Sequence, residues 1–467
     1  MQIPILNGIY TDNNIDYRTS YPRNLIPIPS NNGLISQGYL RQAYGLVKSG
    51  DGPGIDRGAI NWNGTCYRVM GSKLTSIDSL GNIAILGDVG DDGLVTMDYS
   101  FDRLAIASNG NLFYWDDTTL TQVTDPDLGI VIDVTWVDGY FMTTDGQYLI
   151  VTELNDPLSV NPLKYGSSEA DPDPIVGLQK VRNEVYALNR YTIEVFDNVG
   201  GENFPFARIE GAQIQKGCIG TRCSCVLSDM IAFMGSGRNE TISIYVGANS
   251  VAKRIATDEI DQILMGYSED VLAETVLETI MHKGNQYLMV HLPDQCLVYS
   301  HDASNQIQIP IWFTLTTSID GLGQFRAKNI VWCYDKWLCG DPSSTAYGYF
   351  DDTVSTHYGE VNGWEFGTTI IYNEGRGAIF YDLELIALTG RVILGDNPTI
   401  STQYSLDGVT WSTERFISAG KIGEMNKRLV WFNQGHMRQY RLQRFKGTSD
   451  AYISISRLEA HIEPMGA

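Results

Sequence analysis

A short apolar run recurs along most of the chain, and this repeat limits the possible folds more than any other feature. Its seven copies start 36 to 57 residues apart, and most are followed by a Gly- or Asn-containing turn and a second β-forming segment. Repeats of this spacing with several short strands each predict a β-propeller, in which neighbouring units cover one another's apolar faces. The runs are CYRV (66–69), LAIA (104–107), YFMT (140–143), VYAL (185–188), MIAF (230–233), YLMV (287–290) and WLCG (337–340).

Segments outside the repeat predict the rest of the architecture. Residues 1–57 lack periodicity and are rich in Asn, Pro, Gly and Ser, which is typical of an extended N-terminal arm that lies against something else. Residues 363–467 alternate like the strands of an antiparallel β-sandwich. Within 257–279, Thr257 and Ser268 precede acidic residues and predict a short helix pair inserted between two blades. We therefore predict an all-β protein with a β-propeller of six or seven blades over 58–362, the arm before it and an appended C-terminal antiparallel β-sandwich after it.

The charge balance narrows the classes of partner. The formal net charge of −22 excludes a protein that reads nucleic-acid sequence, because such a protein needs a basic face to neutralise phosphates. Two interpretations stay open: an acidic surface that keeps the protein soluble, or a wall that does not retain DNA passing beside it. The first residues resemble no signal peptide and no apolar run is long enough to span a bilayer. We expect a protein made in a cytosol, without a membrane anchor.

Neither the cysteines nor the acidic turns predict a metal site or a cofactor. The spacing of Cys218, Cys223 and Cys225 is not that of a zinc knuckle and no histidine lies nearby, so we expect buried free thiols. The acidic clusters GDVGDDG (87–93) and EADPDP (169–174) lack the alternating spacing of a calcium loop, so turns are favoured. The six histidines do not pair at ligand spacing.

Catalytic motifs are missing as well. The chain has no G-x-S-x-G elbow, no phosphate-binding glycine loop and no H-E-x-x-H. SLDGVTW (405–411) resembles the S-x-D-x-G-x-x-W box of sialidase propellers, but one residue is missing between Asp407 and Gly408, and a polar turn capped by Trp411 explains it. A structural scaffold is favoured. A sialidase-like or polysaccharide-cleaving enzyme and a receptor-binding adhesin stay as alternatives. Conversion of a glycan panel would reveal the enzyme, and binding of the isolated protein to host cells would reveal the adhesin.

Two segments are candidates for docking partners. The main basic concentration alternates with apolar residues, an arrangement that in a strand places charges on the face opposite the core. This face is either an ordinary solvated surface or one that meets an acidic neighbour. In the second case, the double substitution Arg438→Glu with Arg441→Glu would leave the monomer folded yet block its addition to particles that carry this neighbour. The candidate residues are Tyr39, Leu40 and Arg41 in the arm, and Lys427, Arg428, Arg438, Arg441 and Arg444 in the basic stretch.

Several stretches, in matching order and over nearly the whole length, resemble a known family. They resemble the tail-hub proteins of short-tailed bacteriophages, also called packaged-DNA stabilisation or head-completion proteins. Tyr44 stands where that family tends to have proline. The stretches are GYLRQAYGL (38–46), RGAINWNGTCYRVMGSKL (57–74), PIVGL (174–178), YTIEVF (191–196), QKGCIGTRC (215–223), VLET (276–279), HLPDQCLVY (291–299) and NKRLVW (426–431).

The resemblance implies a structural virion protein without catalytic residues. Members form a ring, reported as a hexamer, below the portal and its adaptor ring. The ring extends the DNA channel, retains the packaged genome and carries a tail needle or plug and tailspikes or fibres. The implied location is the virion tail, after synthesis in the host cytoplasm. Together with the net charge, this role predicts that the face lining the channel is acidic.

Overall fold

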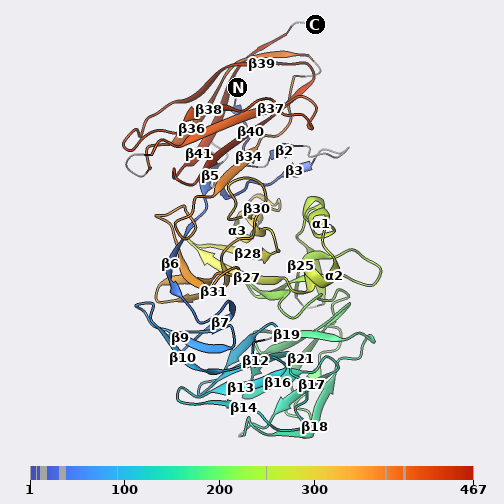
Figure 1. Ribbon diagram of the computed structural model, residues 1–467. Coiled ribbons are helices and arrows are strands. Elements are labelled where there is room, and N and C mark those ends of the chain that lie inside the picture. Colours follow the sequence, from blue (N-terminus) through green and yellow to red (C-terminus); the bar gives the residue numbers. More distant parts are fainter. Residues whose placement is uncertain are drawn as a thin grey trace. The chain divides into compact units, whose positions relative to one another are not determined.

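The computed structural model consists of two compact units (Figure 1). Residues 48–292 and 327–349 form the first, called here the propeller unit. Residues 1–47, 293–326 and 350–467 form the second, called the sandwich unit. The structure describes residues 2–6, 8–10, 18–30, 38–91, 93–154, 156–248, 250–373, 376–392 and 396–465.

Antiparallel sheets follow one another along the propeller unit, and in each complete one four consecutive strands pair in chain order (Figure 1). The first two sheets contain β7 (Asp56–Trp62), β8 (Thr65–Met70), β9 (Lys73–Ile77) and β10 (Ile83–Asp88), then β11 (Thr96–Tyr99), β12 (Leu104–Ser108), β13 (Asn111–Trp115) and β14 (Leu120–Gln122). The next three contain β15 (Asp133–Val137), β16 (Tyr140–Thr144), β17 (Tyr148–Thr152) and β18 (Val160–Ser167), then β19 (Ile175–Val181), β20 (Glu184–Asn189), β21 (Ile193–Asn198) and β22 (Phe206–Arg208), then β23 (Ser224–Leu227), β24 (Met230–Gly235), β25 (Ser243–Ala248) and β26 (Val251–Arg254).

Two more repeats complete the series in this unit. One contains the hairpin of β27 (Val276–His282) and β28 (Asn285–His291). The other contains β31 (Lys328–Cys333), β32 (Lys336–Gly340) and β33 (Ala346–Asp351), and β6 (Gly45–Asp51) lies beside β33 as its fourth strand. The described residues thus form seven repeats, within the predicted range of six or seven.

Each predicted apolar run lies in the second strand of its repeat. This strand pairs on both sides within its sheet, and its side chains are buried almost continuously, as in β12 and β24. A strand buried on both faces has no polar alternation, which is why the sequence shows runs and not an alternating pattern. The hairpin before β8 turns through Asn63 at φ 51° and Gly64 at φ 80°, the left-handed pair that a tight two-residue hairpin needs.

The helix pair expected in 257–279 is present. It consists of α1 (Asp258–Leu264) and α2 (Glu269–Ala273), and the Thr257 side chain accepts a hydrogen bond from the backbone N–H of Ile260. Asp258 and Asp261 both pair with Arg254, at 2.7 and 2.5 Å, so one guanidinium offsets part of the negative charge at the start of this helix. No helix in the described part of the chain is long and apolar enough to cross a bilayer.

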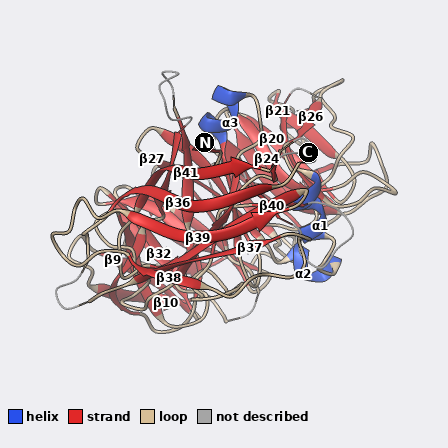
Figure 2. Ribbon diagram, turned by 90° about the horizontal axis from the view of Figure 1, so that it is seen from above, coloured by secondary structure: helices blue, strands red, loops and turns tan. Residues whose placement is uncertain are grey.

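The sandwich unit contains two large sheets, and β36, β39 and β41 of the first run alongside one another in Figure 2. The first sheet has the order β39 (Leu429–Met437), β36 (Ala378–Leu388), β41 (Ser454–Pro464), β5 (Gly38–Gln42) and β4 (Leu25–Pro29), with β1 (Gln2–Ile3) also on β41. The second has the order β34 (Gly363–Gly367), β40 (Tyr440–Thr448), β37 (Thr399–Ser405) and β38 (Arg415–Ser418), with β35 (Ile371–Tyr372) on β40. Their inner faces share one apolar core that includes Leu25, Leu40, Trp364, Phe445 and Leu458.

Short elements complete this unit. They are the hairpin of β2 (Gly8–Tyr10) and β3 (Arg18–Ser20), the paired strands β29 (Cys296–Ser300) and β30 (Trp312–Leu315), and α3 (His301–Ile307).

The structure shows what the predicted N-terminal arm lies against. Strands β4 and β5 belong to a sandwich sheet, where blue β5 lies beside orange and red strands in Figure 1. The Asn24 side chain donates 2.7 Å to the carbonyl of Gly363, and β6 completes the last propeller sheet. Strand β5 pairs with β41 and β6 pairs with β33, and both of these partners are hundreds of residues away. The local sequence pattern therefore does not indicate the pairing. Residues 11–17 and 31–37 of the predicted arm lie outside the described residues.

Candidate functional site

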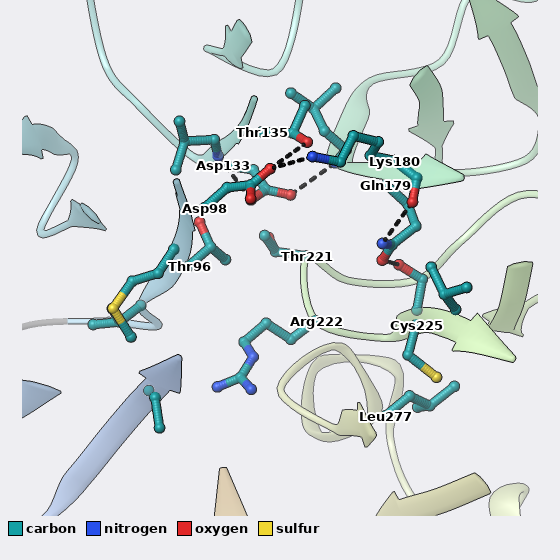
Figure 3. A pocket seen from close by; sticks show the side chains of 18 residues that line it. Thr96, Asp98, Asp133, Thr135, Gln179, Lys180, Thr221, Arg222, Cys225 and Leu277 are labelled. Carbon is teal, nitrogen blue, oxygen red and sulfur yellow. Dashed lines mark hydrogen bonds and ion pairs between the residues drawn. The ribbon is translucent and has the colours of Figure 1, made fainter. Parts of the chain in front are cut away.

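The first strands of the propeller repeats converge on a polar cavity of about 330 Å³ (Figure 3). Strands β7, β11, β15, β19, β23 and β27 each contribute lining residues. The ionisable groups that line it are two carboxylates, Asp98 and Asp133, two cations, Lys180 and Arg222, and the Cys225 thiol. The charges are therefore balanced, and this cavity is not an acidic wall.

The carboxylates hold neighbouring repeats together. Asp98 of β11 accepts a 2.6 Å hydrogen bond from the backbone N–H of Trp136 in β15. Asp133 of β15 accepts one of 2.7 Å from the N–H of Leu178 in β19. A first strand has no strand partner toward the centre, so its inner N–H groups would otherwise lack acceptors. Each acid supplies the acceptor for the next repeat along the ring.

Glu278 in β27 extends the same arrangement to the last repeat. It accepts from the N–H of Ile330 in β31 at 3.3 Å and lies 3.2 Å from the Nε2 atom of His291. The Arg222 guanidinium contacts Glu278 at 3.3 Å and donates 2.5 Å to the side-chain oxygen of Asn329. Three repeats therefore present a carboxylate to the next one, and we call Asp98, Asp133 and Glu278 the inter-repeat carboxylates.

The cations of the cavity are also engaged. The Lys180 ammonium donates 2.7 Å to the carbonyl of Trp136 and lies 3.3 Å from the Asp98 carboxylate (Figure 3). Both carboxylates and both cations of the cavity are thus bound to partners within the chain, and these contacts hold neighbouring repeats of the propeller together. Neither pair of charges provides a nucleophile with an adjacent base.

Asp133 makes the stability of the propeller depend on pH. Burial raises its pKa to about 6 from an ordinary value of 3.8. The folded state therefore binds this proton more tightly than the unfolded state, and stability falls as pH rises from about 4 to about 6, by about 3 kcal/mol at most. We expect the excess in thermal midpoint of the wild type over Asp133→Asn to be largest near pH 4, to shrink between pH 4 and about pH 6, and to level off above that. An excess that is constant or grows with pH would contradict this assignment.

A buried ion pair lies beside the centre. The Arg68 guanidinium, whose side chain is fully buried, pairs with Asp56 and donates 2.8 Å to the carbonyl of Asn329. Gly340 is packed against this pair, because a Cβ at that position would lie 1.9 Å from the Asp56 carboxylate.

The sequence contained a signal for the inter-repeat carboxylates that we did not use. Each is an acidic residue inside an otherwise apolar or hydroxylated strand, as in TMDY, DVTWV and VLETI. Acidic residues are depleted in strands, so an acid within the first strand of several repeats indicates a specific partner.

The arm candidates Tyr39, Leu40 and Arg41 lie on β5 and do not form one exposed patch. Tyr39 is exposed, whereas Leu40 is fully buried in the sandwich core. Arg41 is half-buried, with its guanidinium 5.7 Å from the Tyr44 ring. Leu40 is thus a core residue and unavailable to a partner.

The basic stretch is dispersed as well. Lys427 pairs with Glu424 at 3.2 Å, and Arg428 makes a two-pronged pair with Glu384 at 2.8 and 2.7 Å. Arg438 is exposed in the turn between β39 and β40.

The predicted alternation is wrong for Arg441, which is fully buried like its neighbour Leu442. Its guanidinium lies 4.4 Å from the Phe380 ring and 4.0 Å from the Tyr404 ring, and burial lowers its pKa to about 9. Arg444 stacks at 4.1 Å on Trp411. Both arginines lie on β40, where residues 441–443 are buried in succession, so charged and apolar side chains are not divided between a solvated face and a core face.

The SLDGVTW segment is a turn. Asp407 accepts from the backbone N–H groups of Val409 and Thr410 at 2.9 and 2.7 Å, and Ser405 accepts from the N–H of Gly408 at 2.7 Å. Hydrogen bonds lower the pKa of Asp407: the bond from the Thr410 hydroxyl is the largest cause, and the two backbone bonds come next. The side chains form the turn and are not presented for catalysis.

None of the described cysteines forms a disulfide, and all are buried except Cys225, which is half-buried. Burial raises the pKa of Cys66 to about 11 and that of Cys218 to about 12, so both are protonated and inert at neutral pH. No group of three or more His, Cys, Asp or Glu side chains suited to a metal ion occurs among the described residues. Asp92 of the GDVGDDG cluster lies outside them.

Two family models match the chain in succession. The model described as Bacteriophage P22 Gp10, beta-propeller, matches residues 1–355, and the one described as Bacteriophage P22 Gp10, beta-sandwich, matches residues 363–463. The chain belongs to the P22 Gp10 family. A relative within the P22 Gp10 family, the tail hub protein gp10 of Salmonella phage P22, is 28% identical over 486 aligned residues that cover 99% of each chain.

Solved structures similar to this P22 Gp10 family member include two other chains. The WD40 domain of Neurospora crassa Pan2 has a TM-score of 0.42 and 11% identity, covering 64% of this chain and 90% of that one. The computationally designed Ika8 protein has a TM-score of 0.39 and 10% identity, covering 66% of this chain and 100% of that one.

Membership of the P22 Gp10 family confirms the predicted fold class and role. The chain is a structural tail hub protein of a bacteriophage, a component of the virion that associates with other parts of the tail, and not an enzyme.

Proposed function

We propose that copies of this chain form a closed ring, a hexamer, around the path of double-stranded DNA below the portal-adaptor ring. The ring extends the DNA channel, retains the packaged genome and carries a tail needle or plug and tailspikes or fibres. The observation that supports this most is the match to a tail hub protein over 99% of both chains, with the propeller and sandwich models in the same order.

The propeller centre supports a channel made by the assembly and not by one chain. Its cavity of about 330 Å³ is locked by the inter-repeat carboxylates and their partners. It cannot admit a duplex whose major groove alone is about 12 Å wide. DNA would therefore pass between copies, and the net charge of −22 favours sliding over retention. We propose that the face of each copy toward the channel is acidic.

The exposed docking candidates fit contacts with ring neighbours or the adaptor. Tyr39 and Arg438 are exposed, and the Arg428 side chain is 74% exposed although paired with Glu384. We propose that these three residues contribute partner contacts, whereas Leu40 and Arg441 support the fold.

Counting copies in the virion tests the ring. Quantitative mass spectrometry of purified virions is expected to give six copies per portal ring, and particles made without this protein are expected to lose their DNA. The purified chain should not bind host cells, which separates a hub from an adhesin. A copy number incompatible with a closed ring, or particles that keep their genome without the protein, would contradict the proposal.

A further inference from the structure

One face of the propeller unit collects two sets of turns. Because successive strands of each sheet are antiparallel, the turn between its first and second strands and the turn between its third and fourth strands lie at the same end. First strands of a propeller run in the same direction around the centre, so these ends share a face. We call this the turn face. It contains the first-to-second turns 63–64, 100–103, 138–139, 182–183, 228–229, 283–284 and 334–335, and the described residues of the third-to-fourth connections, which are 78–82, 116–119, 153–154, 156–159, 199–205 and 250.

Large apolar side chains are exposed in and next to these turns. Phe101 is 91% exposed and contacts Trp136 edge-on, with ring centroids 5.9 Å apart. Trp332 is 47% exposed and packs edge-on against Trp337 at 5.2 Å. Met281, 59% exposed, accepts a 2.9 Å hydrogen bond from the Trp337 indole at its carbonyl. Grouped exposed aromatics on one face are typical of a binding surface, whereas single ones are common on any protein.

The same turns are strongly acidic. Among their described residues, ten are acidic and three are basic. Arg103 is paired with Asp102 at 2.7 Å, Lys164 with Glu153 at 2.7 Å, and Arg182 lies 3.9 Å from Asp229. The other seven acidic residues are exposed. The acidic residues are Asp78, Asp102, Asp116, Asp117, Asp138, Glu153, Asp156, Glu202, Asp229 and Asp335, and the basic ones are Arg103, Arg182 and Lys283.

We propose that the turn face docks a basic segment of a different protein, one in which lysine or arginine side chains alternate with apolar anchors. Carboxylates attract such a segment, and exposed aromatic rings accept its cations face-on and its apolar side chains. The chain already contains this geometry in Lys180, whose ammonium lies 5.3 Å from the Trp136 ring. Nucleic acid and anionic lipid carry the wrong charge, and a second copy of a chain with net charge −22 is a poor electrostatic match. This partner is additional to the ring contacts proposed above.

Carbodiimide cross-linking of intact virions tests the proposal, because the reagent joins a carboxylate directly to a lysine amine. Mass spectrometry is expected to find carboxylates of the turn face, such as Asp138 and Asp335, joined to lysines of another virion protein. Cross-links only to other copies of this chain would overturn the proposal. Failure of these carboxylates to link while those elsewhere on the chain do so would overturn it too. The copy number per virion is measured separately, so either proposal can fail alone.

Matched variants separate docking from folding. Phe101→Ser with Trp332→Ser is expected to reduce the cross-link yield and infectivity at least tenfold, whereas Leu163→Ser, at a 70% exposed position on the outer strand β18, is expected to change neither. Asp138→Asn with Asp335→Asn removes two charges at φ 47° and 56°, where asparagine is tolerated, and is expected to give a loss of about threefold. If the variant with both serine substitutions does not fold, the result for the variant with both asparagine substitutions decides whether the proposal stands. Wild-type yields from the folded variants, or capture of a neutral oligosaccharide by this face in place of the cross-links, would overturn the proposal.

Discussion

Replacing Asp56 with alanine is expected to lower the free energy of unfolding of the propeller unit by about 3–5 kcal/mol. The substitution leaves the fully buried Arg68 guanidinium without its counter-charge, and the remaining 2.8 Å bond to the Asn329 carbonyl does not neutralise it. Urea denaturation followed by tryptophan fluorescence and by hydrogen exchange of the propeller strands would measure the loss.

Two variants calibrate this result. Lys73→Ala removes one partner of the exposed Lys73–Asp88 pair and is expected to cost far less than Asp56→Ala, because solvent screens an exposed pair. Gly340→Ala is expected to be as severe as Asp56→Ala, because its Cβ would overlap the Asp56 carboxylate. If Asp56→Ala costs no more than Lys73→Ala, the buried pair does not stabilise the unit in the way described.

Arg441→Glu is expected to prevent the sandwich unit from folding, at a cost above about 4 kcal/mol, while Arg438→Glu leaves it folded. Arg441 lies between the Phe380 and Tyr404 rings and donates 2.5 Å to the Gln434 carbonyl, so a carboxylate there would be buried against two ring faces and a carbonyl. Arg438 is exposed in a turn. Circular dichroism and limited proteolysis of the purified variants would distinguish the two outcomes.

This difference also determines how docking can be tested. Arg438→Glu alone, with Arg441→Met as the control for packing, isolates the surface charge from the core. Arg441→Met is expected to fold because a long apolar side chain can occupy the space between the rings. If Arg441→Glu folds as well as Arg438→Glu, the described burial of Arg441 is incorrect.

The sequence predicted those parts of the fold that depend on local pattern. The apolar runs located the second strand of all seven repeats, and Thr257 located the start of α1. These succeed because burial on both faces and N-capping leave signals within a few residues. The resemblance to phage tail hubs, which depended on the order of many short stretches, was confirmed.

The failures depend on long-range pairing or on the interior. Residues 25–29 and 38–42 show no periodicity of their own, so the sequence predicted an arm that lies against something else without identifying its partner, a sheet of C-terminal strands. Arg441 was assigned to the solvated face because alternation predicts two faces, but it lies between aromatic rings. The inter-repeat carboxylates were missed because an acid within a strand has meaning only once its neighbour in the ring is known.

The way in which distant segments complete each unit sets the order of events during synthesis. Strand β6 emerges from the ribosome almost 300 residues before β33, and β1 and β5 emerge more than 400 residues before β41. The first five propeller sheets can form as they are translated, but neither unit can close until its last strand has been made. Such distant contacts make folding slow, because loop closure precedes any gain from pairing. A chain that stops early therefore keeps open sheet edges and lacks a finished sandwich, so we expect truncated copies to be removed by proteolysis before they can enter a tail.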